Sequence, residues 1–257
     1  MTRKNVVLLA GIAVVLAGAC HRGGAVYDGF ESPALGSQWE TKRFLPGAVE
    51  IQSAVVRAGA RAARITLRSG DQIPQERGTR LERAELQEPT WLWSGEESAS
   101  AYSFSLFLPR DFPIVPTRLV IAQWKHRCPG EQCAPDNPML AIRYQGGEML
   151  ITKQVTPQSE ILYRTTDDIR DRWLDFRFEI RFSRGRGGRI KAWLGGRQII
   201  DHQGATAYPE AGGYTGRGLF YFKTGLYRDQ MSEPMTIYVD EYRKQPLPAG
   251  DGAGPRS

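Results

Sequence analysis

The sequence has few cysteines and no long stretch of helical periodicity. Three cysteines in 257 residues exclude a disulfide-dense mini-protein, and the lack of a sustained 3.6-residue apolar period excludes a coiled coil. The 28 glycines and 16 prolines are spread along the chain, which excludes collagen and low-complexity sequence. We find no internal repeat, and 41% of the residues are hydrophobic. The chain therefore predicts one globular domain with a sizeable core.

Several catalytic and metal-binding signatures are also missing. The sequence contains no Gly-x-Ser-x-Gly, His-Glu-x-x-His or Gly-x-x-x-x-Gly-Lys motif, which argues against serine hydrolases, zinc proteases and P-loop enzymes built on them. Only three histidines are present, and no metal-ligand spacing is found, so we expect no metal site and no required cofactor. A structural calcium bound by loop oxygens would leave no readable signature.

Positive charge is in modest excess. The chain has 34 Lys and Arg against 28 Asp and Glu, a formal charge of +6, and loss of two basic residues with a leader would leave +4 (34 − 2 − 28). This excess permits a polyanionic partner without requiring one. The Arg-Gly cluster at 184–189 resembles an RNA-binding tract, but its place between two expected strands predicts a hairpin turn. We therefore expect no nucleic-acid partner.

The N-terminal segment has the pattern of a secretory signal. Two basic residues precede the apolar run Val6–Leu16, which is too short to span a bilayer comfortably. Small residues then lead to Cys20, as in a bacterial lipoprotein signal whose cysteine is lipidated; an ordinary cleavage site is the alternative. We expect a signal peptide at 1–19 and a tether at 20–25. The protein would then be extracytoplasmic, in the periplasm, at the outer membrane or secreted, with a lipid anchor as its one membrane contact.

The two remaining cysteines, Cys128 and Cys133, flank Pro-Gly-Glu-Gln in a segment rich in proline. In an oxidising compartment, two cysteines this close in a loop most simply form a local disulfide. A zinc site would need further Cys or His ligands, and only His126 is nearby. We therefore expect a disulfide here rather than a metal site.

Alternation of apolar and polar residues runs through most of the chain and predicts an all-β fold. In Trp173–Phe182, every second residue from Leu174 onward is apolar and the residues between them are charged, so this strand buries one face. Further strands are expected at 63–67, 83–87, 102–108, 118–125, 139–144, 149–153, 190–194, 198–200, 218–227 and 235–242. Many short strands with Gly and Pro turns predict a sandwich or barrel. We expect one domain at 26–244, a disordered tail at 245–257 and a monomer.

The alternation also predicts which side chains share a face in three of these strands. The residues expected on the core side are Ala84, Leu86, Val120, Ala122, Trp124, Phe220 and Phe222. The residues expected on the opposite face are Arg83, Glu85, Gln87, Gln123, Lys125, Tyr221, Lys223 and Tyr227. This second set is rich in cations, amides and tyrosine, which suits it to hold a carboxylate and move a proton.

Three motifs in these strands resemble those of a known enzyme family. They are Arg-Ala-Glu-Leu at 83–86, Gln-Trp-Lys-His at 123–126 and Tyr-Phe-Lys-Thr-Gly-Leu-Tyr-Arg at 221–228; the flanks at 28–31 and 238–242 are similar too. The sequence resembles the jelly-roll polysaccharide lyases, closest to the heparin lyase I-like group and related to alginate and glucuronan lyases. The resemblance implies a concanavalin-like jelly roll of two antiparallel sheets, with a cleft on the concave face for an acidic polysaccharide. The implied reaction is β-elimination, in which a base removes the C5 proton next to the uronate carboxylate and the C4–O bond breaks.

The resemblance also implies roles for individual residues. Tyr227 matches the catalytic tyrosine that protonates the leaving oxygen, and Lys223 would lie beside it and lower its proton affinity. Gln123 and Arg83 would hold and neutralise the carboxylate, with Glu85 orienting Arg83. The same motifs place Tyr221 and Arg228 among the substrate-binding residues.

The base is where this sequence departs from the family. Family members commonly show Gln-x-His, but here Lys125 stands at the histidine position and His126 follows with the opposite parity. Three alternatives remain open: a bulge turns His126 into the cleft, Lys125 replaces it, or Tyr227 serves as both base and acid. A lysine base would need a pKa lowered by burial or by cationic neighbours such as Arg83 and Lys223.

Two other functions are consistent with the same scaffold. The first is a non-catalytic carbohydrate-binding lipoprotein, and the second is a glycoside hydrolase, which would need two carboxylates flanking the bond. The sequence does not identify the polyuronate or distinguish endo from exo cleavage. A sulfated chain would suit the basic residues expected in loops, namely Arg110, Arg118, Arg127 and Arg143.

Overall fold

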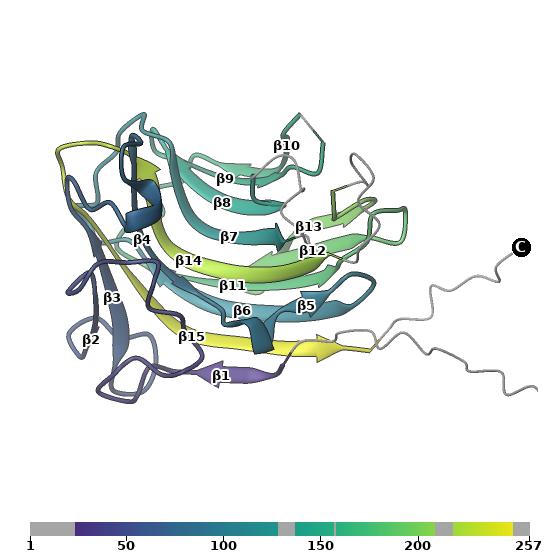
Figure 1. Ribbon diagram of the computed structural model, residues 1–257, viewed down its shortest axis with the longest axis horizontal. Helices are drawn as coiled ribbons and strands as arrows, with labels where there is room; N and C mark the ends of the chain where they lie inside the picture. The colour runs from purple at the N-terminus through teal and green to yellow at the C-terminus, as the bar shows by residue number, and fades with distance from the viewer. Residues whose placement is uncertain (1–23, 128–136, 157, 209–217, 249–257) are drawn as a thin grey trace, which may run out of the picture.

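The computed structural model describes residues 24–127, 137–156, 158–208 and 218–248, which form two stacked antiparallel sheets (Figure 1). The larger sheet has the strand order β13-β12-β11-β6-β15-β3-β2, with β1 paired to β15. The smaller sheet has the order β10-β9-β8-β7-β14-β4, with β5 paired to β14. Within these residues the helical segments are two single 3-10 turns, η1 (Pro74–Glu76) and η2 (Thr90–Leu92). The predicted all-β jelly roll of two antiparallel sheets is confirmed.

The strands follow the predicted alternation closely. The larger sheet contains β1 (Val26–Asp28), β2 (Val49–Gln52), β3 (Ala62–Leu67), β6 (Ala99–Phe107), β11 (Trp173–Arg181), β12 (Arg189–Leu194), β13 (Arg197–Gln203) and β15 (Met235–Leu247). The smaller sheet contains β4 (Leu81–Gln87), β5 (Ser94–Gly95), β7 (Leu119–Arg127), β8 (Leu140–Gln145), β9 (Glu148–Lys153), β10 (Glu160–Thr165) and β14 (Leu219–Asp229). The alternation does not predict β1, β2, β5 or β10, because the first three are very short and β10 has no buried side chain.

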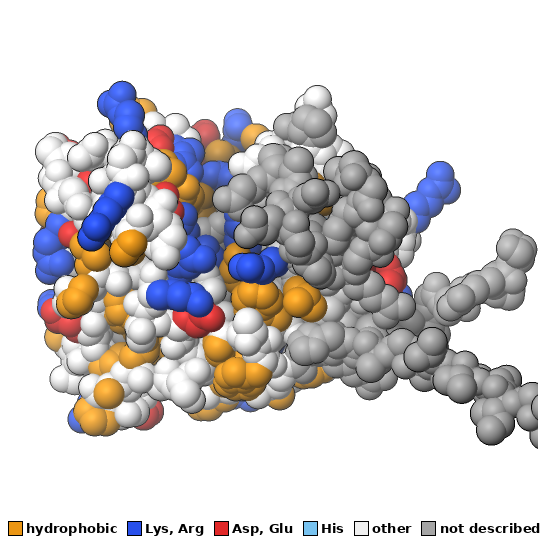
Figure 2. Space-filling view, in the orientation of Figure 1, with side chains coloured by type: hydrophobic (Ala, Val, Ile, Leu, Met, Phe, Trp, Pro, Cys, Tyr) orange, Lys and Arg blue, Asp and Glu red, His pale blue; other side chains and the backbone are white. Residues whose placement is uncertain are grey.

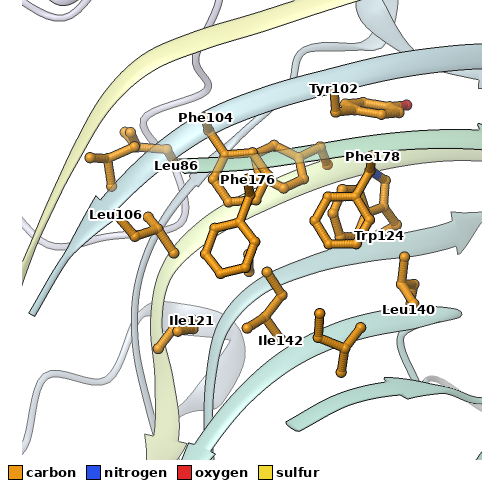
Figure 3. Packing of buried hydrophobic residues seen from close by; sticks show 14 of the residues in the cluster. Leu86, Tyr102, Phe104, Leu106, Ile121, Trp124, Leu140, Ile142, Phe176 and Phe178 are labelled. Atoms are coloured by element: carbon orange, nitrogen blue, oxygen red, sulfur yellow. The ribbon is translucent and has the colours of Figure 1, made fainter. Parts of the chain in front are cut away.

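Aromatic side chains fill the space between the two sheets (Figure 3). Phe104 of β6 lies 5.4 Å from Phe176 and 4.9 Å from Phe222, measured between ring centroids, and Trp124 of β7 lies 4.6 Å from Phe178. Aromatic pairs at these distances contribute about 0.5–1.5 kcal/mol each beyond the burial of their area. The core therefore holds the inner faces of β7 and β14 in place. The outer faces of these two strands carry the polar residues.

A buried polar group, the inner cluster, consists of Glu88, Tyr242 and Lys244. The Glu88 carboxylate accepts hydrogen bonds from the Tyr242 hydroxyl, from Lys244 Nζ at 3.1 Å and from the backbone N–H of Phe222 at 3.0 Å. All three members of the inner cluster are completely buried. Because a buried charge is tolerated when it is paired and hydrogen-bonded, the inner cluster joins β15 of one sheet to β14 of the other.

One predicted face is wrong, because β7 contains a bulge. The pairing of β7 with β8 shifts between Val120 and Ala122, so Ile121 is the extra residue of the bulge. Ile121 consequently packs into the core, and Val120 lines the opposite face. A strict two-residue period predicts the reverse for Val120. The other core-side predictions of the three strands, from Ala84 to Phe222, are confirmed.

The C-terminal boundary also differs from the prediction. β15 continues through Leu247 and pairs with β6 as far as Ala99, so the disorder expected from residue 245 does not hold for 245–247. Burial of Lys244 in the inner cluster holds this end of the strand in place. Cys20, Cys128 and Cys133 lie outside the described residues, and their lipidation and disulfide stay predictions. In the part of the chain that the structure describes, no helix has the length and apolar character to cross a membrane.

Candidate active site

Three adjacent strands at one end of the smaller sheet, β7, β14 and β4, carry the predicted site residues on one face. Tyr227 of β14 pairs with Arg83 of β4, while Lys223 pairs with Gln123 of β7. All four side chains line a cleft of about 350 Å³, a volume within the usual range for ligand sites. The structure thus brings these four residues together, and their roles in a reaction stay predictions.

The cleft is strongly basic. Among its lining residues in the described ranges, Glu76 is the one acid, and the cations are Arg43, Arg83, Arg118, Lys125, Arg143 and Lys223. Figure 2 shows basic side chains gathered over the middle of this face of the molecule. A cleft lined by one sign of charge concentrates ligands of the other sign. The site is therefore suited to an anionic ligand.

Glu85 is almost completely buried, and it contacts three of the residues that line the cleft. Its carboxylate accepts hydrogen bonds from Arg83 Nη1 and Gln123 Nε2, and it lies 3.8 Å from Lys223 Nζ. Burial raises the pKa of Glu85, but Arg83 and Lys223 outweigh burial and hold that pKa below its ordinary value. Glu85 is thus a carboxylate that orients Arg83, as expected, and Gln123 as well.

Gly225 makes this arrangement possible. Glu85 on β4 and Gln123 on β7 are separated by β14, and Gly225 is the β14 residue paired with Glu85. Because glycine has no side chain, the two polar side chains meet across this strand. Gly225 has φ +141°, and a Cβ there would lie 2.3 Å from the carbonyl oxygen of Ala84. The position therefore requires glycine.

Arg83 is held from several sides. Its Nε and Nη2 donate to Glu76 Oε1 at 2.9 Å and 2.6 Å, and its Nη1 donates to Glu85. Its guanidinium carbon lies 3.8 Å from the centroid of the Tyr227 ring, a cation–π distance. Most of the donors of Arg83 are therefore already used within the protein, and its role toward a substrate carboxylate stays a prediction.

Tyr227 lies among arginines and not beside Lys223. Arg83 and Arg118 both lie over its ring, the second at 4.8 Å. Lys223 is four residues away along the extended strand and is not among the charges that shift the pKa of Tyr227, so the expectation that Lys223 lowers the proton affinity of the tyrosine is wrong. Burial raises the pKa of the Tyr227 hydroxyl above its ordinary value, although Arg83 and Arg118 oppose this. Tyr227 therefore carries its proton at neutral pH and can act as an acid.

Lys223 lines the cleft and has a strongly lowered pKa. Burial lowers its pKa to about 7, the cations Arg83, Arg43 and Lys125 act in the same direction, and Glu85 opposes them. A substantial fraction of the amine is therefore neutral at pH 7, as a general base requires. The sequence analysis considers a lysine base only at position 125, and it gives Lys223 a supporting role beside the tyrosine.

His126 does not line the cleft. Its ring stacks on Phe220 at 4.6 Å and on Tyr208 at 5.8 Å between centroids, and burial, with Arg184, lowers its pKa to about 4. β7 continues to Arg127, so no bulge turns His126 toward Tyr227. The prediction that His126 takes part in catalysis is wrong for this arrangement, because its parity places it on the core side of the sheet.

Arg228 is likewise outside the cleft. It is completely buried, its Nε donates to Glu82 at 2.8 Å, and its Nη1 donates to the Glu233 carbonyl at 2.6 Å. Its predicted role in substrate binding is wrong, because it follows Tyr227 directly in β14 and so points to the other face. Tyr221 does line the cleft, and it stacks on the buried Trp93 at 4.6 Å. Lys125 lines it too.

Several residues of the cleft have no recognisable signal in the sequence. Glu76 comes from η1, and Arg43 comes from a loop. Arg118 and Arg143 are visible in the sequence as basic residues, but their place beside Tyr227 depends on the order of β8, β7 and β14 in the sheet. Within the described ranges, no group of three or more His, Cys, Asp or Glu is placed to bind a metal ion; the expectations on cofactors and calcium stay predictions.

The fold and the cleft together define a jelly-roll protein with a basic cleft on its smaller sheet. Comparison of the sequence with family models gives the family: the polysaccharide lyase model matches residues 34–243. The chain belongs to the polysaccharide lyase family. The narrower resemblance to the heparin lyase I-like group stays a prediction. No curated protein sequence matches the chain.

Solved structures confirm the fold. An endo-β-1,4-glucuronan lyase from the fungus Trichoderma reesei superposes with a TM-score of 0.67 at 18% identity, covering 86% of this chain and 95% of that chain. A double mutant of the alginate lyase Aly36B, in complex with an alginate trisaccharide, gives a TM-score of 0.55 at 11% identity, covering 88% of this chain and 99% of that chain. The catalytic domain of a glycoside hydrolase family 131 protein from Coprinopsis cinerea gives 0.55 at 15% identity over 90% and 89%. Lyases and a hydrolase thus share this fold.

Proposed function

We propose that the protein cleaves a uronate-containing polysaccharide by β-elimination, with Lys223 as the base and Tyr227 as the acid. The observation that carries the proposal is that Lys223 and Tyr227 both line one basic cleft. Lys223 has a pKa lowered to about 7, and the pKa of Tyr227 is raised. One group is therefore ready to accept a proton at neutral pH, and the other is ready to give one.

The cleft supplies the electrostatic part of the reaction. The C5–H of a uronate becomes acidic when its carboxylate is neutralised, because the electrons left at C5 then spread onto the carboxylate oxygens. Gln123 presents an amide group fixed by Glu85, and Lys125 lies on the same strand and face. Fixed donors and cations of this kind stabilise an enediolate without rearranging during the reaction.

The proton transfers then balance. Neutral Lys223 takes the C5 proton, the electron pair of that bond forms the C4=C5 double bond, and the C4–O bond breaks. The Tyr227 hydroxyl gives its proton to the departing oxygen. The lysine later releases its proton to solvent, and the tyrosinate regains one. Tyr227 as both base and acid is the rival scheme, and its raised pKa disfavours a phenolate base.

The same geometry argues against a glycoside hydrolase. That reaction needs two carboxyl groups flanking the bond, one as an acid and one as a base or nucleophile. In the described part of the cleft, Glu76 is the one lining carboxylate and the buried Glu85 contacts the lining residues, and Arg83 donates hydrogen bonds to both of them. Neither is available as a free acid, so elimination suits the site better than hydrolysis.

Ultraviolet absorbance of the unsaturated uronate end tests the proposal. The wild type is assayed on a panel of acidic polysaccharides beside Tyr227→Phe, with Tyr238→Phe on the larger sheet as the matched control. We expect a rising signal on at least one polyuronate and a loss of about 10²–10⁴-fold in Tyr227→Phe, the usual size of a general-acid contribution. Absence of the signal on every polymer, with binding retained, would instead favour a carbohydrate-binding protein.

The polymer and the location of the protein belong to the proposal as well. The glucuronan and alginate lyases among the structural neighbours make unsulfated polyuronates the first substrates to test.

The N-terminal pattern supports an extracytoplasmic protein held at a membrane by a lipid on Cys20. Incorporation of a labelled fatty acid into the wild type, but not into Cys20→Ala, would test that anchor.

A further inference from the structure

Arg143 of β8 is a cation of the cleft that the proposed reaction does not use. Its strand position pairs with Val120 of β7, which pairs with Tyr227 of β14. Arg143 and Tyr227 are therefore in one row across the sheet, two strand spacings or about 10 Å apart at the backbone. Both side chains line the cleft. Arg143 thus lies next to the proposed acid, on the side away from Arg83.

The bonding of Arg143 differs from that of the neighbouring arginines. Arg83 is paired with Glu76 and Glu85, and Arg118 is paired with Asp229 at 2.8 Å. Arg143 donates from Nε to the hydroxyl of Thr152 on β9 at 3.1 Å. Among the described residues, no carboxylate lies within ion-pair distance of it. A neutral hydroxyl orients this guanidinium, while none of the described residues supplies a counter-charge to it.

The surroundings make that unbalanced charge costly. Burial lowers the pKa of Arg143, and the nearby positive charge of Arg118 acts in the same direction. An arginine in a protein stays protonated all the same. Its desolvated charge and the repulsion from Arg118 would both be relieved by an anion bound between the two side chains.

From this arrangement we infer that Arg143, with Arg118, forms a second anion subsite, which binds the acidic group of the sugar next to the uronate that loses its C5 proton. The inference rests on the proposed lyase reaction, since that reaction sets which sugar lies over Tyr227 and Lys223. A guanidinium binds a carboxylate or a sulfate through paired N–H donors. The shared chemistry is therefore an anionic oxygen group on the adjacent sugar.

This subsite narrows the substrate class. A homopolymer of uronates places a carboxylate on each of two adjacent sugars, so both the reaction site and the second subsite are filled. A polymer in which a uronate alternates with a neutral sugar leaves Arg143 unpaired and desolvated by the bound chain. An alternating polymer with a sulfated partner sugar restores the anion. The structure therefore assigns the enzyme a preference for two consecutive acidic sugars.

The test compares these three polymers, using kcat/KM for the wild type, Arg143→Gln and Arg143→Lys. The control is Arg197→Gln, at an exposed arginine on the larger sheet. We expect Arg143→Gln to lose about tenfold on the homopolyuronate, mainly through KM, the effect of one charge-assisted contact. Its preference for the homopolymer over the neutral alternating polymer should shrink by the same factor. Arg143→Lys should recover part of the loss, and Arg197→Gln should behave as the wild type.

The sulfated polymer separates the two sources of the anion. If only the carboxylate geometry fits, the sulfated alternating polymer will be as poor a substrate as the neutral one; if either anion fits, it will approach the homopolymer. An Arg143→Gln enzyme with the wild-type KM and the wild-type preference would overturn the subsite while leaving the lyase reaction standing.

Binding provides a readout that does not depend on turnover. Titration calorimetry of a uronate tetrasaccharide against Tyr227→Phe, with and without Arg143→Gln, should show about tenfold weaker binding in the double variant. Equal binding by the two proteins would refute the subsite even if no polymer is cleaved. Melting temperatures of all variants identify any loss that comes from misfolding.

Discussion

Two neighbouring parts of the molecule use glutamate, lysine and tyrosine in different ways. In the inner cluster, Glu88 binds both Tyr242 and Lys244, and all three are sealed between the sheets. At the cleft, the buried Glu85 is shared by Arg83 and Lys223, and these two cations line the cleft. The inner cluster balances one negative charge with one positive charge, whereas the cleft has more positive charge than its acids neutralise. Residue type therefore does not decide the role of these groups; charge balance and access do.

The two lysines show what sharing a carboxylate does. Lys244 lies 3.1 Å from Glu88 and also donates to the Leu92 carbonyl. Lys223 lies 3.8 Å from Glu85, whose charge is already used by Arg83. Burial lowers the pKa of both lysines, and that of Lys223, which shares its carboxylate with Arg83, falls to about 7. The two lysines differ in access, because Lys223 lines the cleft and Lys244 is sealed between the sheets.

Replacement of each lysine by methionine should give the largest effects, on turnover at Lys223 and on stability at Lys244. Lys223→Met should lower turnover by about 10²–10⁴-fold, because the proposed base is removed, and it should leave a folded protein. Lys244→Met leaves Glu88 buried without its counter-charge and should reduce the free energy of unfolding by about 3–5 kcal/mol. Initial rates and urea unfolding measure the two effects. A Lys223→Met enzyme with wild-type turnover would remove Lys223 from the reaction.

Replacement of each glutamate by glutamine should distinguish the cleft from the inner cluster through the pH dependence of kcat. The proposed base must be neutral, so kcat should rise with pH through the Lys223 pKa of about 7. Glu85 raises that pKa, so Glu85→Gln should lower it further and move the acid limb of the profile down by on the order of one pH unit. Glu88→Gln, outside the cleft, should leave the limb in place. A limb that stays fixed or moves upward in Glu85→Gln would contradict the assignment of the base.

The smallest expected effect concerns His126, which belongs to neither group. Its pKa is about 4 in the folded protein, below the ordinary value near 6.5. The unfolded chain therefore binds more protons between these values, and stability falls as pH drops from 6.5 towards 4. His126→Phe should keep the ring stacking and flatten this slope in melting temperatures taken from pH 7 to pH 4.5. Turnover at pH 7 should stay near the wild-type level; a large loss with an intact fold would return His126 to the site.

The sequence predicts much of this site, because alternation is reliable where strands are regular. Residues 83–87 and 221–227 lie on the predicted faces, and their motifs point to the cleft. The predictions fail for physical reasons at particular places. A bulge at Ile121 shifts one face, and the charges that act on Tyr227 are Arg83, Glu76 and Arg118 rather than the expected Lys223. Arg143 and Glu76 join the site only through the sheet order and a loop, which no local pattern encodes.

The central claim is that the cleft performs elimination, and the mass of its products tests this most directly. Elimination adds no water, so the fragment with the new non-reducing end should be lighter by one water than the hydrolysis product. It should also carry a double bond. We predict such fragments from a homopolyuronate with the wild type, and none above background with Tyr227→Phe or Lys223→Met. Fragments that have gained one water per cleaved bond, and that are absent with the same variants, would contradict the account and make the protein a hydrolase.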